Sequence, residues 1–328
     1  MRTILRRLGF YLLAAFAALT LNFFLLRMLP GNPLAAALAK STGQITPAQL
    51  EGLEKLYGIG THQSLASQYL TYLGQLLHGN LGTSTAKSVP VTTLIGTDLP
   101  WTLGLVSVAT AVAFILGTLI GVMAGWRRSG LLDALLPVST FFQAVPYFIL
   151  SFLLLLYVGY YGGLFPISNG YDTGRGSTVT EGWNLGFVGS VIDHGFLPAA
   201  AIALASIAGW IVGMRNMMIT TMDEDYVLVA AAKGLPQWRV AAVAARNALL
   251  PSISNFALSI SLVVTGSIVT EIVFSYPGLG SEISTAIQNT DYPVMQGIVI
   301  VVVFTVLAVN FLADLAYVAL DPRARKEA

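Results

Sequence analysis

The chain has 328 residues, of which 55% are hydrophobic and only 10% are charged. Soluble domains carry about 25% charged residues, so this is an integral membrane protein. The formal net charge of +1 gives no reason to expect a nucleic-acid partner. Cysteine is absent, which excludes disulfides, thiolate metal sites and cysteine nucleophiles. The three histidines, His62, His78 and His194, show no metal-ligand spacing.

The hydrophobic residues fall into six stretches that reach the roughly 20 apolar residues a membrane-spanning helix needs. These stretches are Gly9–Leu29, Trp101–Gly125, Leu135–Tyr160, Leu197–Thr220, Ser252–Phe274 and Val294–Leu320. The sequence therefore predicts an all-α integral membrane protein with six transmembrane helices. The first stretch follows Arg2, Arg6 and Arg7, which also suits a signal peptide. Because its apolar run is longer than the 7–15 residues of a signal sequence, we expect a retained helix.

A long polar segment, 30–99, separates the first two stretches. Within it, Thr46-Pro47 has the form of a helix start, and residues 64–78 show a second helical pattern. We expect this segment to form an extracytoplasmic cap. The predicted organisation is then a first helix at 1–29, the cap at 30–99, a five-helix core at 100–320 with a cytoplasmic loop at 221–250, and a cytoplasmic tail at 321–328.

The basic residues predict the orientation, because cytoplasmic segments of membrane proteins are enriched in Lys and Arg. With the N-terminus inside, twelve of the 17 basic residues are cytoplasmic. These are Arg2, Arg6, Arg7, Arg127, Arg128, Arg215, Lys233, Arg239, Arg246, Arg323, Arg325 and Lys326. We therefore expect both termini and the segment 221–247 in the cytoplasm.

Two rows of small residues predict close helix packing. One row is Gly117, Gly121 and Gly125, and the other is Ala201, Ala205, Gly209 and Gly213. Small residues spaced four apart let membrane helices approach closely. We expect both rows to be structural contacts between helices.

The fifth stretch carries a polar stripe on one helical face. A polar face in a membrane helix points to protein or water and not to lipid. Such a stripe lines a translocation path or bonds to neighbouring helices, and the sequence does not decide between them. The candidate path residues are Asn255, Ser259, Leu262, Gly266 and Thr270. For the two acids near the spans, Glu271 and Asp314, we favour hydrogen bonds between helices or an interfacial position over a proton relay.

The cytoplasmic segment 225–251 reads as helix, glycine break, helix. The acids at 223–225 suit the positive end of a helix dipole, and Gly234 is placed to end that helix as its C′ residue. Pro236 then suits the start of a second helix over 237–247. The short apolar faces need a protein surface to cover them. The alternative is an amphipathic loop lying on the membrane.

Around this segment the chain resembles the permease subunits of binding-protein-dependent ABC importers, specifically the B-type permeases of dipeptide and oligopeptide systems. Leu228-Val229-Ala230 and Gly234 stand where that family has Glu-Ala-Ala, three residues, Gly, and Pro251 comes 17 residues after the Gly. Further matches are Arg27-Met28-Leu29-Pro30-Gly31-Asn32-Pro33, Gly79-Asn80-Leu81-Gly82-Thr83-Ser84, Tyr276-Pro277-Gly278-Leu279-Gly280, Asp291-Tyr292-Pro293-Val294 and Asp321-Pro322-Arg323. Leu228 replaces the Glu that names the motif, and Asn32 and Asn80 replace acids.

The resemblance implies a type I ABC importer permease fold in a prokaryotic cytoplasmic membrane. It implies that the broken cytoplasmic helix docks on an ATP-hydrolysing subunit through Glu224, Asp225, Tyr226, Leu228, Val229, Ala230, Ala231, Ala232, Lys233 and Gly234. This chain lacks the glycine-rich Walker loop, so ATP and Mg would be bound by the partner ATPases and no cofactor by this chain. The implied partners are a homologous second permease forming a heterodimer, two ATP-binding subunits, an extracytoplasmic substrate-binding protein and the bilayer.

Several alternatives stay open. Permeases of this type also carry oligosaccharides or nickel chelates instead of peptides. A secondary transporter would need no ATPase and would usually show an internal repeat with broken helices, of which the sequence gives no sign. An intramembrane hydrolase would need Ser with His, paired acids or a metal site within the helices. The lack of a histidine within a span and of a Gly-x-Ser-x-Gly motif argues against it.

Overall fold

The computed structural model describes residues 2–28, 64–127, 131–174 and 177–320. In these residues the regular secondary structure is helical, apart from one bridge between Thr83 and Pro90, and loops connect the helices. The elements are α1 (Arg2–Met28), α4 (Leu65–Leu77), α5 (Val91–Trp126), α6 (Leu131–Ala144), α7 (Tyr147–Leu153), the π-helix η1 (Leu154–Tyr161), α8 (Leu185–Met222), α9 (Asp225–Ala232), α10 (Gln237–Val273), α11 (Leu279–Asn289) and α12 (Tyr292–Leu320). The predicted all-α class is confirmed.

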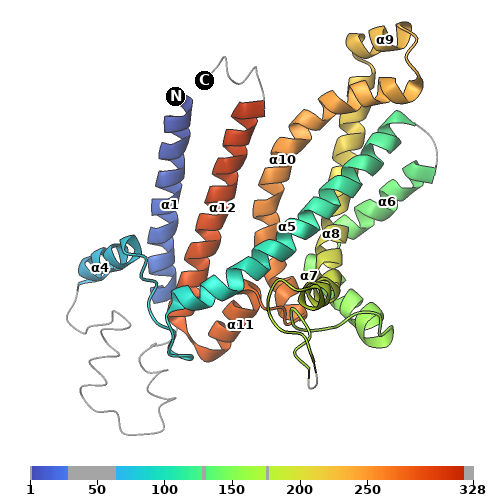
Figure 1. Cartoon of the computed structure of the whole chain (residues 1–328). Coiled ribbons are helices and arrows are strands. Elements are labelled where there is room, and N and C mark those ends of the chain that lie inside the picture. Colours follow the sequence, from blue (N-terminus) through green and yellow to red (C-terminus); the bar gives the residue numbers. More distant parts are fainter. Residues whose placement is uncertain (1, 29–63, 128–130, 175–176, 321–328) are drawn as a thin grey trace, which may run out of the picture.

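Four of the described helices are long and apolar enough to cross a membrane, or five spans are present if the bent pair α6 and α7–η1 counts as one. The four are α1, α5, α8 and α12. In Figure 1, α9 lies at the far end of α8 and α10, toward the same end as the start of α1, while α11 and α7 lie toward the opposite end. The predicted start of the cap, including Thr46-Pro47, the tail 321–328, and the motifs at 29–33 and 321–323 lie outside the described residues.

Helices α1 and α12 lie side by side (Figure 1) and are joined by polar groups. The Asp314 carboxylate pairs with Arg7, with 3.0 Å between Oδ1 and Nη1, and accepts a hydrogen bond from the Tyr11 hydroxyl at 3.0 Å. The carboxylate side chain is 34% exposed, so it sits at a half-open helix contact. This confirms the expected hydrogen bond between helices for Asp314.

Helices α5 and α8 approach through the first glycine row. A Cβ atom built on Gly117 would lie 2.5 Å from the Cβ of Trp210, and one on Gly125 would lie 2.6 Å from the Cβ of Met218. Gly121 is equally close to the α8 backbone. Distances this short leave no room for any side chain, so the predicted role of this row is confirmed.

The residues of the second row, on α8, lie in two different environments. Ala201 and Ala205 are buried against Leu150 of α7, as the packing prediction requires. Gly213 is exposed, and a Cβ atom there would meet nothing within 4 Å. A Cβ atom on Gly209 would lie 3.5 Å from Gln143 Nε2 of α6, so of this row only Gly213 borders open space instead of another helix, and the packing prediction is wrong there.

The predicted span Leu135–Tyr160 is wrong as a single straight helix. The chain breaks after Ala144, resumes at Tyr147, and the two parts are bent by 103°. Pro146 explains the break, because proline has no N–H to donate and disfavours a helical residue before it. Broken helices are typical of secondary transporters, and the sequence shows no sign of one. One broken helix is nevertheless present here.

The fifth span also differs from its prediction. The expected helix at 237–247 and the span beginning at Ser252 form one continuous helix, α10, of 37 residues. Pro251 lies inside it without ending it; neighbouring helices commonly compensate for proline within membrane proteins. The second helix of the broken segment is thus continuous with the predicted fifth membrane helix.

The opposite end carries two shorter helices. α4 confirms the predicted helix at 64–78; its N-cap Ser64 accepts a hydrogen bond from the Ser67 amide, and it packs on α1 through Phe23, Tyr69 and Tyr72. Helix α5 begins at Val91, inside the segment assigned to the cap. Helix α11, in the connection 275–293, was not predicted.

Candidate functional site

Helix α9 forms where the sequence predicted the first helix of the broken segment, one residue earlier at each end than the expected 226–233. Glu224 is its N-cap, Asp225 lies in its first turn, and it ends at Ala232 with Lys233 as the C-cap. Gly234 follows with φ +79°, a left-handed conformation that glycine adopts at little cost. Pro236 is the N-cap of α10. The expected helix, glycine break and helix are therefore confirmed as local structure.

One face of α9 is anchored to the rest of the protein. Val227 is 2% exposed and packs in a cluster with Met218 of α8 and with Val240 and Ala244 of α10. Ala230, one turn after Val227, is buried as well. This cluster fixes α9 across the ends of α8 and α10.

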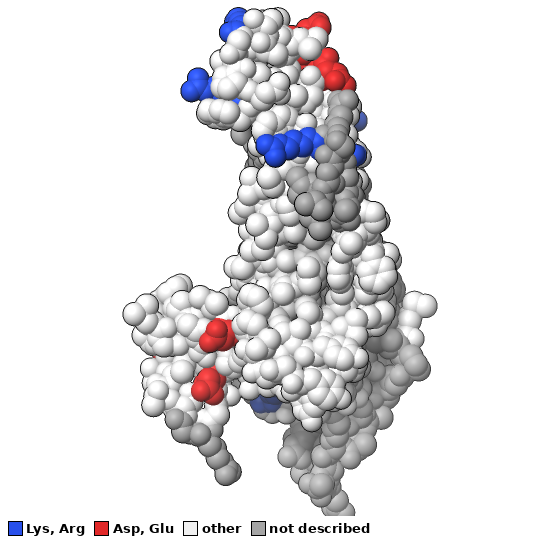
Figure 2. Space-filling model, turned by 90° about the vertical axis from the view of Figure 1, so that its right-hand side faces the viewer, with Lys and Arg blue, Asp and Glu red and all other residues white. Residues whose placement is uncertain are grey.

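The other face of α9 is apolar and uncovered. Tyr226 is 41% exposed, Leu228 57% and Val229 53%, and Trp238 at the start of α10 is 59% exposed. Ala231, Ala232, Lys233 and Gly234 are exposed too. Figure 2 shows acidic side chains on one side of this end of the molecule and basic ones on the other, above a body with few charges. Burying such a face against another protein is favourable.

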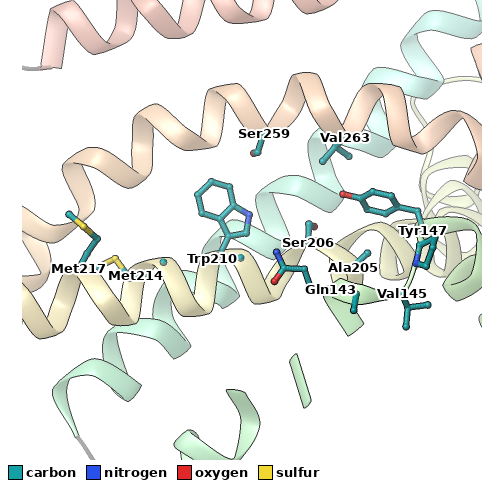
Figure 3. Close-up of a pocket in the computed structure, with 14 residues that line it drawn as sticks. Gln143, Val145, Tyr147, Ala205, Ser206, Trp210, Met214, Met217, Ser259 and Val263 are labelled. Carbon is teal, nitrogen blue, oxygen red and sulfur yellow. The ribbon is translucent and has the colours of Figure 1, made fainter. Parts of the chain in front are cut away.

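A second feature is a groove of about 720 Å³ between the α6–α7 break, α8 and α10. Gln143 and Tyr147 come from the break, Ser206 and Trp210 from α8, and Ser259 from α10 (Figure 3). Met214, Met217 and Val263 supply apolar walls. Irregular backbone at membrane depth is tolerated where it is buried in protein or lines a cavity, and this break lines one.

The candidate path residues of α10 are spread over different surroundings. Ser259 lines the groove. Gly266 makes room for the Tyr147 ring, since a Cβ atom there would lie 3.0 Å from Tyr147 Cε2. Thr270 is fully buried and accepts a hydrogen bond from the Ser151 hydroxyl at 2.9 Å, so it joins α10 to α7. The side chains of Asn255 and Leu262 lie outside the described residues.

At the opposite end, the loop before α5 is tied to α11 and the start of α12. The Ser84 hydroxyl and the Ala86 amide donate to Asp291 Oδ2 at 2.5 and 3.0 Å. Lys87 Nζ lies 2.8 and 2.6 Å from the two Glu282 oxygens. These contacts give a structural reason for the Gly-Asn-Leu-Gly-Thr-Ser and Asp-Tyr-Pro motifs, which the sequence alone left unexplained.

Glu271 also belongs to this end. It is fully buried, and its Oε2 accepts a hydrogen bond from the Gly280 amide at 2.7 Å. The Leu279 amide donates to Thr102 Oγ1 at 2.9 Å, so α10 and α5 together hold the start of α11. Burial, with the nearby Glu271 carboxyl, raises the pKa of Tyr276 to about 12. The expected hydrogen-bonded role of Glu271 is confirmed.

The described residues contain no cluster of three or more His, Asp or Glu side chains that could hold a metal ion. The two candidate functional features are the uncharged groove and the uncovered apolar face of α9. Helices α8 and α10 connect them.

Comparison of the sequence with known proteins identifies the family of this chain. Residues 117–326 match the family of binding-protein-dependent transport system inner membrane components. The chain is 33% identical to the dipeptide transport system permease protein DppB of Lactococcus lactis, over 98% of each chain. It is 33% identical to the di/tripeptide transport system permease protein DppB of Pseudomonas aeruginosa, over 99% of this chain and 98% of that one. It is 32% identical to the oligopeptide transport system permease protein AppB of Bacillus subtilis, over 92% of each.

These matches cover nearly the whole chain and include both the segment 225–251 and the groove. They also account for the absence of a nucleotide loop, because a membrane component of this kind of system depends on an ATPase partner and on a binding protein. The chain belongs to the family of binding-protein-dependent transport system inner membrane components and is a non-catalytic, multi-pass permease subunit of an ABC transporter.

Proposed function

We propose that this chain forms half of the translocation path of an importer for di- and oligopeptides, with a homologous second permease forming the other half. The support for peptides is that relatives matched over almost their full length are named for dipeptide, di/tripeptide and oligopeptide transport. Oligosaccharide or nickel-chelate transport remains the alternative cargo, and ligand binding by the cognate binding protein distinguishes them.

The proposed topology has six spans with both termini in the cytoplasm. Helix α10, with 37 residues, supplies the sixth span beside the four helices and the bent pair. The start of α1 and helix α9 lie toward the same end in Figure 1, in agreement with the distribution of basic residues. The cap 30–99 and the loop 161–196 then face the binding protein.

The segment Glu224 to Gly234 is proposed as the contact with the ATPase, which would bind ATP and Mg. The observation that carries this proposal is the division of α9 into an anchored face and an uncovered apolar face. Val227 is 2% exposed whereas Leu228, the next residue, is 57% exposed. A helix held this way transmits a push from its outer face into α8 and α10. The path then lies along the face of α10 that carries Ser259, while the buried Thr270 serves packing.

Single cysteines test the contact directly, because the chain has none of its own. Leu228→Cys should cross-link to a cysteine series on the ATPase subunit in the assembled complex. Two matched controls should not: Val227→Cys, which is buried, and Trp183→Cys, which is fully exposed just before the start of α8, at the other end of that helix from α9. Equal cross-linking at positions 183 and 228, or none at 228 in an active complex, would overturn the assignment.

A further inference from the structure

The groove beside the α6–α7 break is free of charge. Among the described residues that line it, none is Asp, Glu, Lys, Arg or His, although polar atoms are present throughout. A fixed charge in a path would favour cargo of one sign and repel the other. An uncharged lining instead suits a group that every peptide shares, the neutral backbone amide.

The groove also offers hydrogen-bonding groups without partners. Within the part of the chain that the structure describes, the Gln143 amide, the Tyr147 hydroxyl and the Trp210 indole N–H have no hydrogen-bond partner. The Ser206 and Ser259 hydroxyls donate to carbonyls of their own helices at 2.7 Å, which leaves their oxygens as acceptors. The groove therefore presents both free donors and free acceptors, as an amide requires.

Two of these side chains, Trp210 and Tyr147, are held in place by packing. The Trp210 ring lies edge-on to Phe114 at 5.0 Å, and its Cβ sits against Gly117 of α5. The Tyr147 ring occupies the space that Gly266 leaves. Gln143 is exposed near the end of α6, and Figure 3 shows these side chains between α8 and α10. Rigid donors bind with less loss of entropy than mobile ones.

We propose that the α6–α7 break is a cargo subsite in which Gln143 and Tyr147 donate hydrogen bonds to peptide carbonyls and the Ser206 and Ser259 oxygens accept from peptide amides. Trp210 and Met214 provide the apolar wall. The subsite accepts peptides regardless of side-chain charge. This inference rests on the proposed peptide-import function and specifies where this chain contacts its cargo.

Gly213 provides the test, because it lines the groove and a side chain there meets nothing within 4 Å. The complex, with both permeases, both ATPases and the binding protein, is reconstituted in vesicles with Gly213→Asp or Gly213→Lys. Uptake of Ala-Glu-Ala and Ala-Lys-Ala is compared. The Asp variant should lower uptake of the acidic peptide relative to the basic one about fivefold, and the Lys variant should do the reverse, as expected for one charge several ångströms away.

The matched control is Gly74 on α4, outside the groove, where a Cβ atom also meets nothing within 4 Å; Asp or Lys there should leave the uptake ratio unchanged. Gln143→Ala should lower uptake of both peptides equally, about fivefold for one lost hydrogen bond, without changing peptide affinity of the binding protein.

Three results would overturn the subsite. The first is a ratio of acidic to basic peptide uptake that is the same in Gly213→Asp and Gly213→Lys. The second is loss of the second permease from the complex in both Gly213 variants, which would mean that this partner fills the groove. The third is unchanged uptake in Gln143→Ala. A wild-type complex that imports neither peptide but does import an oligosaccharide would instead refute the proposed function itself.

Discussion

A Cβ atom at Gly121 would lie 2.7 Å from the Cβ of Met214, so α5 and α8 touch with no room for a methyl group. Met214 also lines the groove, and Met218, one turn further along α8, belongs to the cluster that anchors α9. One face of α8 thus connects α9, the α5 contact and the groove. If α9 couples the ATPase to transport as proposed, this packed face is the route from α9 to the groove.

Gly121→Ala should destabilise the protein, because overfilling a packed contact costs about 1–3 kcal/mol. We expect a lower midpoint of thermal unfolding in detergent. Gly104→Ala is the matched control, since Gly104 lies on the same helix with nothing within 4 Å of its Cβ position. That control should be neutral or gain up to about 1 kcal/mol from helix propensity. Equal effects at both positions would mean that the α5–α8 contact is not tight.

Gly234→Ala should weaken coupling through backbone strain alone. Its φ is +79° and no atom lies within 4 Å of its Cβ position, so the cost of roughly 1–2 kcal/mol is purely conformational. We expect less peptide imported per ATP hydrolysed. Gly234→Asn should recover much of the loss, because Asn tolerates the left-handed region better than Ala. An Asn variant no better than Ala would point to steric contact with the partner instead.

Lys87→Ala should loosen the tie between the loop before α5 and α11. The Glu282 side chain is only 10% exposed, so removing Lys87 leaves a carboxylate short of its partner at a cost of about 1–3 kcal/mol. Unfolding of Lys87→Ala, Glu282→Ala and the double variant forms a thermodynamic cycle. The double variant should lose less than the sum of the two single losses; simple additivity would show that the ion pair contributes nothing.

The proposed orientation is tested by two exposed tryptophans. Trp183 is 101% exposed and Trp238 is 59% exposed. In sealed vesicles of known orientation, an impermeant maleimide should label Trp183→Cys from the outer face and Trp238→Cys only from the cytoplasmic face. The reverse pattern would refute the topology, and labelling of both from one face would refute the placement of α9 opposite the loop 161–184.

Local signals in the sequence predicted the helix, glycine break and helix of the 225–251 segment and the close helix packing of the Gly117 row, although they did not identify α8 as the partner of that row. The reason is that Gly234 and the Gly117 row act through backbone conformation and close approach, both of which follow from residue type and spacing. The same holds for Asp314, since a carboxylate near the membrane needs a partner. That Arg7 and Tyr11 are the partners of Asp314 could not be predicted from the sequence, because it depends on how α1 packs against α12.

The groove was not predicted, and the reason is physical. Hydropathy averaged over Leu135–Tyr160 cannot distinguish a straight span from one bent by 103°, although Pro146 and the polar Gln143 beside it were available signals. The predicted polar stripe of α10 does not share one environment: Ser259 lines the groove, whereas Thr270 forms a buried hydrogen bond. Helical spacing predicts which residues share a face but not what that face packs against. That α10 continues through Pro251 was not predicted either, because proline usually ends or kinks a helix.

The most direct test of the account is ATP-driven peptide uptake by the reconstituted complex carrying Leu228→Asp. A charge on the uncovered face of α9 should weaken docking of the ATPase while leaving the anchored face intact. We expect ATP-dependent uptake to fall about tenfold or more, the effect of losing roughly 1.4 kcal/mol, with thermal stability of the isolated chain unchanged. Uptake at the wild-type level would contradict the claim that this permease is driven through α9.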